Sequence, residues 1–138
     1  STLDGTLFPY TTLFRSSKQK ILYINNTSTD TLKSYGDVYL EASAFSDALV
    51  FYLRAGHSAG LQKIREIALE NGDTFLFSGA SKALNIEPGN AEWEELARKA
   101  IERKKYLFAR HALEKSDNAE LLNALALQMK TQETKSGE

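Results

Sequence analysis

The sequence predicts an all-α protein built from helices that pair as hairpins. Apolar and small residues recur every three or four positions between residues 30 and 130, which is the period of an α-helix. Turn and capping residues interrupt this stretch at short intervals, and one pattern of large and small residues occurs three times along it. The helical period predicts the fold class, and the interruptions predict about seven helices.

The first three helices are predicted at residues 30–42, 45–55 and 59–70. The first has an apolar face that includes Leu32 and Tyr35. The second should end at Gly56, because glycine readily adopts the left-handed conformation that follows many helices. The third carries apolar residues at helical spacing and stops at the turn-forming pair Asn71-Gly72.

Four further helices complete the prediction. Asp73 is placed to cap the fourth helix with its carboxylate. The segment 87–89, Glu-Pro-Gly, breaks the chain, and Asn90 is the expected cap of the fifth helix. The sixth is predicted at residues 105–115, and the seventh follows Asn118 with an apolar stripe of leucine and methionine.

Residues 1–16 stand apart from this pattern. Thr6–Ser16 reads TLFPYTTLFRS, which matches a translation of a short-read sequencing adapter. We therefore interpret residues 1–16 as non-native and exclude them from the fold. Residues 17–29 are predicted as an N-terminal segment that is possibly truncated, with Ile21–Ile24 either a strand or a helix. Residues 30–130 form the predicted repeat domain, and residues 131–138 a polar tail.

The repeated pattern places a small residue on each helix of a hairpin. The first hairpin has Leu32, Tyr35 and Gly36, then Ala48 and Tyr52, and the third has Trp93, Leu96 and Ala97, then Ala109 and Leu113. The middle hairpin is predicted to use Ile64, Ile67 and Ala68, then Ala80 and Leu84. Small residues let two helix backbones approach closely while large ones fill the space on either side.

This spacing resembles the tetratricopeptide repeat (TPR), a helical hairpin with the pattern W-x2-L-G-x2-Y followed by A-x3-F. The quoted residues carry the resemblance over about 30–116, although the repeat here is shorter than the family's. The resemblance implies a TPR-like α-solenoid, a short right-handed superhelix with a concave groove that binds a protein or peptide. The groove residues it implies are Lys33, Asp37, Leu40, Glu41, Glu94, Arg98, Ile101 and Glu102.

Composition excludes several other classes of function. The chain has no cysteine and a net charge of −1, which excludes disulfides and thiolate metal sites and argues against general affinity for nucleic acid or anionic membranes. Two histidines, His57 and His111, are too few and too far apart in sequence for a metal centre. We expect a cytoplasmic protein with no cofactor, no metal and no membrane span.

The segment 98–115 holds the chain's one concentration of basic residues. Its candidates for contact with an acidic partner or nucleic acid are Arg103, Lys104, Lys105 and Arg110. Glutamates interleave with the basic residues at helical spacing, as in the pairs Glu94–Arg98 and Glu95–Lys99, so a self-paired solvated face is the favoured interpretation.

Catalysis finds little support in the sequence. Gly56–Gly60 matches the G-x-S-x-G motif of serine hydrolases, but that motif needs a strand before its turn, and here a helix is predicted. The sequence therefore favours a non-catalytic interaction or scaffold module. The alternatives are a binder of an acidic partner or nucleic acid through the basic segment, and a structural C-terminal part of a longer solenoid.

If residues 1–16 are an artefact, their removal changes nothing that the rest of the chain does. A chain that begins at Ser17 should unfold at the same temperature as the full chain, within the error of circular-dichroism melts. A fall of several degrees would contradict the exclusion of this segment.

Overall fold

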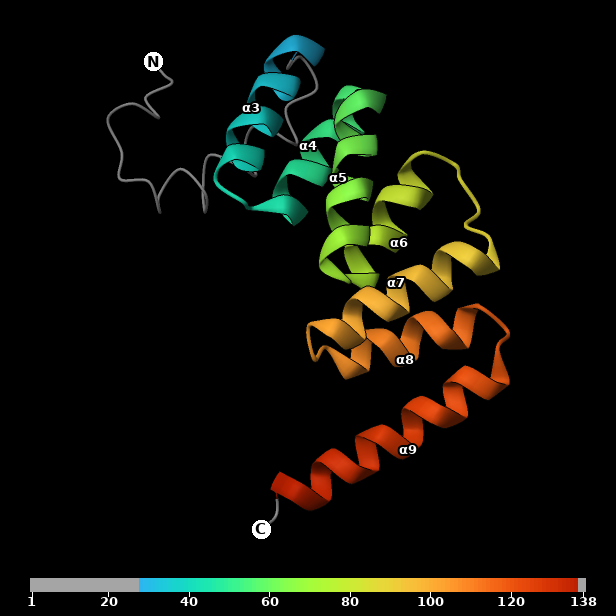
Figure 1. Cartoon of the computed structure of the whole chain (residues 1–138). Coiled ribbons are helices and arrows are strands. Elements are labelled where there is room, and N and C mark those ends of the chain that lie inside the picture. Colours follow the sequence, from blue (N-terminus) through green and yellow to red (C-terminus); the bar gives the residue numbers. More distant parts are fainter. Residues whose placement is uncertain (1–27, 137–138) are drawn as a thin grey trace. The chain divides into compact units, whose positions relative to one another are not determined.

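The computed structural model describes residues 28–136 as seven α-helices, with no strand in that range (Figure 1). The all-α class is therefore confirmed. The predictions for residues 1–16 and for most of 17–29, including Ile21–Ile24, concern residues outside the described range. The helices are α3 (Thr29–Glu41), α4 (Phe45–Ala55), α5 (Ser58–Asn71), α6 (Thr74–Ala83), α7 (Asn90–Glu102), α8 (Tyr106–Lys115) and α9 (Ala119–Ser136).

The predicted helix boundaries agree with the observed ones to within about one residue except at the C-terminal end. Asn90 is not the cap of the fifth helix as predicted: it is the first residue of α7, because the backbone of Gly89 is extended and makes Gly89 the N-cap. The predicted polar tail is not separate, because α9 continues as far as Ser136. Its last turns are polar but contain good helix formers such as glutamine, glutamate and lysine, so the helix propagates beyond its apolar stripe. No helix of the described residues combines the length and the apolar character needed to cross a bilayer.

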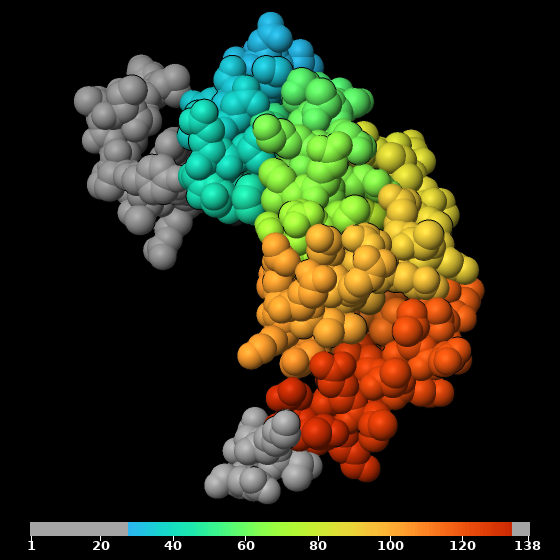
Figure 2. Space-filling model, viewed as in Figure 1, coloured from blue at the N-terminus to red at the C-terminus, as the bar shows by residue number. Residues whose placement is uncertain are grey.

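The chain forms two compact units, one ending at Gly60 and the other beginning at Leu61. In the first unit α3 packs against α4. In the second unit α8 packs against α6, α7 and α9, and α6 also contacts α7. The space-filling view shows the side chains of α7, α8 and α9 as an unbroken surface, coloured from light orange to red (Figure 2).

A left-handed residue follows every one of the first six helices. At the first five of these turns the backbone closes with a hydrogen bond from the next amide to a carbonyl five residues back, as from Ala44 N to Tyr39 O and from Lys105 N to Ala100 O, at 2.9 and 2.8 Å. Only two of these residues are glycines, so helix packing imposes the turn on ordinary side chains as well. The left-handed residues are Ser43, Gly56, Gly72, Asn85, Lys104 and Asp117, with φ between 58° and 68°.

The three hairpins become equivalent when they are aligned on the turn between their helices, at Ser43, Gly72 and Lys104. Eleven residues before the turn, each first helix carries a large buried apolar side chain, and five residues after it each second helix carries a fully buried one. The first set is Leu32, Leu61 and Trp93, and the second is Ala48, Phe77 and Ala109.

This alignment corrects the predicted register of the middle hairpin. Ile67 and Leu84, which were expected to face inward, are only half-buried, and the equivalent positions three residues earlier hold Ile64 and Ser81. Arg65 therefore stands where the other hairpins have Gly36 and Ala97. Ala68 was predicted instead because the repeated pattern has a small residue on the first helix, and Ala68 is a small residue of α5.

In the middle hairpin the large and small residues have changed places. Arg65 on α5 is large, and Ser81 on α6 is small, whereas the first hairpin pairs Gly36 with Tyr52. Arg65 Nε donates a hydrogen bond to Ser81 Oγ at 2.8 Å, and its guanidinium lies 4.6 Å from the centre of the Phe77 ring. Arg65 Nη2 also lies 2.8 Å from Glu92 Oε2, although no well-aligned hydrogen bond joins them.

The turn at Gly72 combines a positive φ with a close backbone approach. A Cβ on Gly72 would lie 2.6 Å from the backbone of Ala100, whereas a Cβ on Gly56, at nearly the same φ, would meet no atom within 4 Å. Backbone atoms cannot move aside as a side chain can. The positive φ therefore favours glycine at both positions, but only at Gly72 does the close backbone approach also exclude a side chain.

The two glycines provide a matched test of this packing. Gly56→Ala should cost about 1–2 kcal/mol, the strain of a left-handed alanine. Gly72→Ala should cost that and about 1–3 kcal/mol more for overpacking against Ala100. Urea unfolding of both variants measures the difference, and equal losses would show that the approach between the Gly72 turn and α7 is not tight.

Candidate functional site

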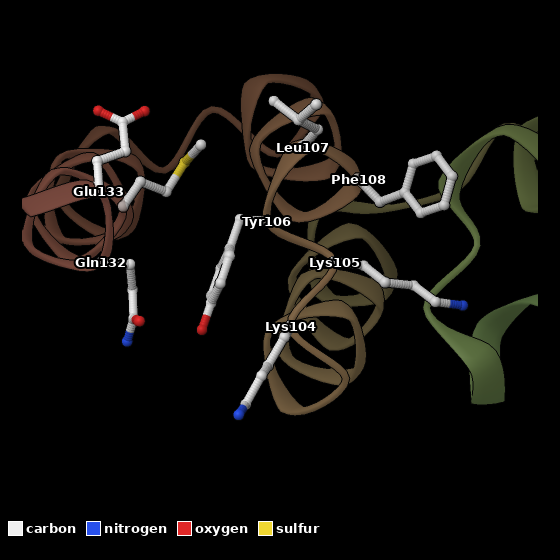
Figure 3. A pocket seen from close by; sticks show the side chains of 8 residues that line it. Lys104, Lys105, Tyr106, Leu107, Phe108, Gln132 and Glu133 are labelled. Atoms are coloured by element: carbon white, nitrogen blue, oxygen red, sulfur yellow. The ribbon is translucent and has the colours of Figure 1, made fainter. Parts of the chain in front are cut away.

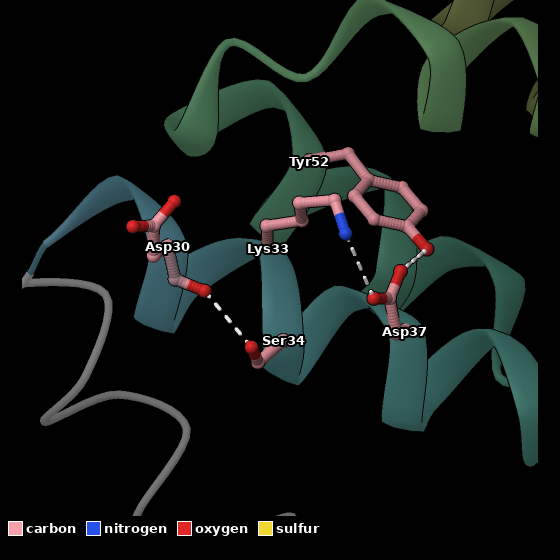
Figure 4. Close-up of polar contacts among 5 residues, drawn as sticks. All are labelled: Asp30, Lys33, Ser34, Asp37 and Tyr52. Atoms are coloured by element: carbon pink, nitrogen blue, oxygen red, sulfur yellow. Dashed lines mark hydrogen bonds and ion pairs between the residues drawn. The ribbon is translucent and has the colours of Figure 1, made fainter.

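The first unit holds a polar cluster at two of the predicted groove positions (Figure 4). Lys33 and Asp37 lie one helical turn apart on α3, and Lys33 Nζ is 3.3 Å from Asp37 Oδ2. Tyr52 on α4 donates from its hydroxyl to Asp37 Oδ1 at 2.6 Å. The Tyr52 ring can reach across because Gly36 has no side chain there, since a Cβ on Gly36 would lie 2.6 Å from the ring.

The protonation states of Asp37 and Tyr52 in this cluster are fixed at neutral pH by their mutual hydrogen bond and by burial. The hydrogen bond from Tyr52 lowers the pKa of Asp37, with help from Lys33 and against a smaller opposing effect of burial. Burial raises the pKa of Tyr52, and the hydrogen bond to Asp37 raises it further. Asp37 therefore remains ionised and Tyr52 protonated, and the Lys33 charge is balanced before any ligand arrives.

The other two predicted groove residues of the first unit differ from this pair. Leu40 is half-buried and Glu41 is exposed. Neither belongs to the hydrogen-bonded cluster, so the structure does not join all four residues of this unit into one site. At this cluster the described side chains thus offer a neutralised pair rather than a free cation.

In the second unit a cleft of about 360 Å³ lies between α7 and α9, with Leu113 of α8 also in its wall. We call it the α7–α9 cleft. It brings together three of the four groove residues predicted for α7, Glu94, Arg98 and Ile101, whereas Glu102 is exposed and outside its lining. The rest of the lining is mostly apolar: Ala97, Leu113, Leu121, Ala124, Leu125 and Gln128.

Hydrogen bonds at one end of the α7–α9 cleft hold α9 in place. Asn118 Nδ2 donates to Glu94 Oε1 at 3.0 Å, while Asn118 Oδ1 accepts from the backbone N–H of Leu121 at 3.0 Å. The same asparagine thus caps α9 and ties that cap to α7. At the rim, Arg98 forms an ion pair with Glu95 one turn earlier, and the Arg98 side chain is 64% exposed, so its guanidinium is accessible to a ligand.

The basic segment is neutralised only in part, because three of its seven basic residues, Arg98, Lys99 and Arg110, have an acidic partner. Arg98 pairs with Glu95 rather than Glu94, and Lys99 lies 3.5 Å from Glu70 rather than beside Glu95. The predicted pairs do not form because Glu94 accepts a hydrogen bond from Asn118, Arg98 pairs with Glu95, one residue nearer along α7, and Lys99 lies beside Glu70 of α5.

The four basic-face candidates have separate environments. Arg110 pairs with Glu114 at 3.3 Å, and Lys105 Nζ donates to the Asn71 carbonyl at 3.0 Å, at the end of α5. Arg103 and Lys104 are exposed and have no ion pair with any residue that the structure describes. Of the four candidates, only Arg103 and Lys104, at the α7–α8 turn, therefore have no acidic or carbonyl partner among the described residues.

Sequence reasoning missed a second and larger cleft, of about 980 Å³, beside α8 and α9 (Figure 3). We call it the α8–α9 cleft. Tyr106 points into the space between the two helices, Leu107 and Glu133 lie on one side of it, and Lys104 and Gln132 lie on the other. The sequence does contain an indication of this cleft, because α9 repeats the first-helix pattern of the hairpins, and the repeated pattern was recognised only in the three hairpins before it.

The histidines and the G-x-S-x-G segment occupy structural positions. The segment comprises the turn between α4 and α5 and the first three residues of α5, and His57 lies against the Tyr52 ring with 5.2 Å between ring centres. His111 stacks on Phe75 at 4.9 Å. In residues 28–136 the structure gathers no group of three potential metal ligands among histidine and the acidic residues.

Comparisons with protein families, with curated proteins and with solved structures find no match for this chain.

The Tyr52–Asp37 hydrogen bond can be tested by acid. Because the pKa of Asp37 is lowered from its ordinary 3.8, its stabilising effect is complete above that pH and disappears as the pH falls through the lowered value. Tyr52→Phe should cost about 0.5–1.5 kcal/mol at pH 7. The gap between wild type and variant in urea unfolding should narrow below pH 3.8, and a gap that stays constant or widens would contradict the assignment.

Proposed function

We propose that this chain is a non-catalytic protein-interaction module of the TPR-like type, and that the α7–α9 cleft binds a short segment of a partner protein. The observation that carries the proposal is the meeting of Glu94, Arg98 and Ile101 in one cleft with an apolar floor. These three residues were implied as groove positions by a resemblance in sequence, and they converge with residues of α9 that the resemblance did not include.

The repeated hairpins support the TPR-like part of the proposal. All three hairpins share the left-handed turn and the buried positions on either side of it. A repeat unit of this kind buries its apolar face by stacking on its neighbours, which favours a solenoid with a first-helix groove. Within the second unit, the contacts of α8 with both α6 and α9 are of this kind.

The size and chemistry of the cleft favour a ligand that inserts one or two apolar side chains. A volume of about 360 Å³ is near the lower end of small-ligand sites, which is enough for side chains but not for a folded element. Ile101, Leu113 and Leu125 supply the apolar contacts. Arg98 pairs with Glu95 through Nη1 but stays 64% exposed, so its other N–H groups can donate to a carboxylate at the rim.

The alternative functions receive less support. A binder of nucleic acid through the basic segment needs a row of free cations, but Arg98, Lys99 and Arg110 each have an acidic partner. The Lys33–Asp37–Tyr52 cluster is an unsuitable site for a carboxylate, because Asp37 already balances the charge of Lys33.

The proposal is tested by selecting peptides from a displayed random library against the folded chain. Selected peptides should bind the wild type and lose about tenfold or more in affinity for Ala124→Trp, which fills the α7–α9 cleft. Leu127→Trp is the matched control, because Leu127 is 68% exposed and lines neither cleft. Circular-dichroism melts check that both variants fold.

Two outcomes would reject the α7–α9 cleft as the binding site. One is the absence of enriched peptides after repeated rounds of selection. The other is a set of peptides that bind Ala124→Trp as tightly as the wild type. Arg98→Glu adds a further reading, since peptides with an acidic residue beside their apolar anchor should bind this variant less tightly.

A further inference from the structure

The last helix repeats the pattern of a first helix in a hairpin. Counted from the left-handed turn before the helix, Leu122 follows Asp117 by the same interval at which Leu61 follows Gly56. The spacing is then the same as in α7: Leu122-x2-Leu125-Ala126-x2-Met129 corresponds to Trp93-x2-Leu96-Ala97-x2-Ala100. By this pattern α9 is the first helix of a fourth hairpin.

The burial of these positions differs sharply between α7 and α9. All four α7 residues are buried, with exposed fractions between 0 and 7%. On α9 only Leu125 is buried, at 2%, whereas Leu122 and Met129 are half-buried and Ala126 is exposed. In α7 the second helix of the hairpin, α8, covers this face. On α9 no helix of the described residues covers the corresponding face.

The neighbouring second helix, α8, has an uncovered face to match. On α6, Thr74 Oγ1 donates to the Phe108 carbonyl at 2.7 Å, and Phe75 contacts the rings of Phe108 and His111. These two residues are how one second helix contacts the next. Their equivalents on α8 are Tyr106 and Leu107, and Leu107 is 71% exposed.

The α8–α9 cleft lies between these two uncovered faces (Figure 3). In the close-up Leu107 projects from α8 and Glu133 from α9 on the same side, where a further second helix would continue the α6–α8 row. The volume of about 980 Å³ and the apolar side chains of Tyr106, Leu107 and Met129 suit the apolar stripe of a helix.

Charge adds a requirement on the sequence of that helix. The second helix α8 begins beside the end of α5, the first helix of the preceding hairpin, where Lys105 reaches Asn71. By equivalence the docked helix would begin near the α7–α8 turn, where Arg103 and Lys104 are both exposed and form no ion pair with a described residue. Acidic residues in its first turn would meet these cations and also favour its own N-terminus.

We propose that the surface formed by α8 and α9 is a docking site for an amphipathic helix with an acidic first turn, supplied by a partner protein. The helix completes the fourth hairpin in trans and extends the row of second helices formed by α6 and α8. This site is distinct from the α7–α9 cleft, which takes single side chains and is lined by Leu121, Ala124, Leu125 and Gln128 of α9, whereas the later residues Met129, Gln132 and Glu133 line the α8–α9 cleft.

The probe is a displayed library of helical peptides of about 18 residues, randomised along one face and in the first turn. Peptides selected on the wild type should share an apolar stripe and one or more acidic residues in the first turn. Leu107→Glu should lower their affinity about tenfold or more. Leu107 is exposed, so this substitution should leave thermal unfolding unchanged.

Two further variants separate the charge requirement from general apolar binding. Lys104→Gln should weaken the selected peptides and reduce the dependence of their affinity on salt, because one opposite-charge contact is lost. Leu127→Glu places the same charge on the opposite face of α9 and should have no effect.

The outcomes distinguish this site from the proposed function. Helical peptides whose binding survives Ala124→Trp but not Leu107→Glu support the α8–α9 site, whatever the random-peptide selection gives. Binding that is abolished by Ala124→Trp and unaffected by Leu107→Glu would overturn it, as would a failure to enrich any helix. Concentration-dependent dimerisation of the wild type in sedimentation, abolished by Leu107→Glu, would identify a second copy as the occupant and also overturn the proposal.

Discussion

The close approach of two helices across a left-handed turn is the constraint on which the other features depend. Each hairpin must pair one large with one small side chain where its helices cross, because backbones cannot approach over two large ones. In the first hairpin this requirement places Tyr52 over Gly36, and the Tyr52 hydroxyl then reaches Asp37. The polar cluster that neutralises Lys33 is therefore a consequence of packing. Because of this cluster, Lys33 is not a free cation that could bind a ligand.

Much of the fold could be predicted from local sequence, because apolar periodicity and capping residues act within a few positions. Gly56 as a helix terminator and Asp73 as a cap, accepting from Leu76 N at 3.1 Å, are confirmed. The left-handed residues Ser43 and Lys104 could not be foreseen, since neither residue type favours that conformation and the packing of the hairpin imposes it. The predicted register of the middle hairpin was wrong for a related reason. The close approach needs one small residue on either of the two helices, and in this hairpin the small residue lies on the second helix.

The candidate site was predictable in part. Glu94, Arg98 and Ile101 share a helix face, and their convergence follows from the helical period once α7 is recognised. Their apolar neighbours on α9 depend on where α9 packs, which sequence spacing does not specify. Ion pairs were the least predictable feature, because Glu70 and Lys99 lie on different helices and meet only after folding. The α8–α9 cleft was not predicted for the same reason. It exists because no described helix covers the neighbouring faces of α8 and α9, and this depends on how the helices pack.

The pairing of Arg65 with Ser81 has a consequence for how relatives of this chain could be recognised. Neither position alone retains a residue type across the three hairpins; what is retained is the combined bulk of the two. A substitution at one position is tolerable only with a matching change at the other, so the two would drift together rather than independently. A comparison that scores each position separately does not use this correlation. A comparison that scores pairs of positions would detect a relationship between divergent chains even where neither position is conserved by itself.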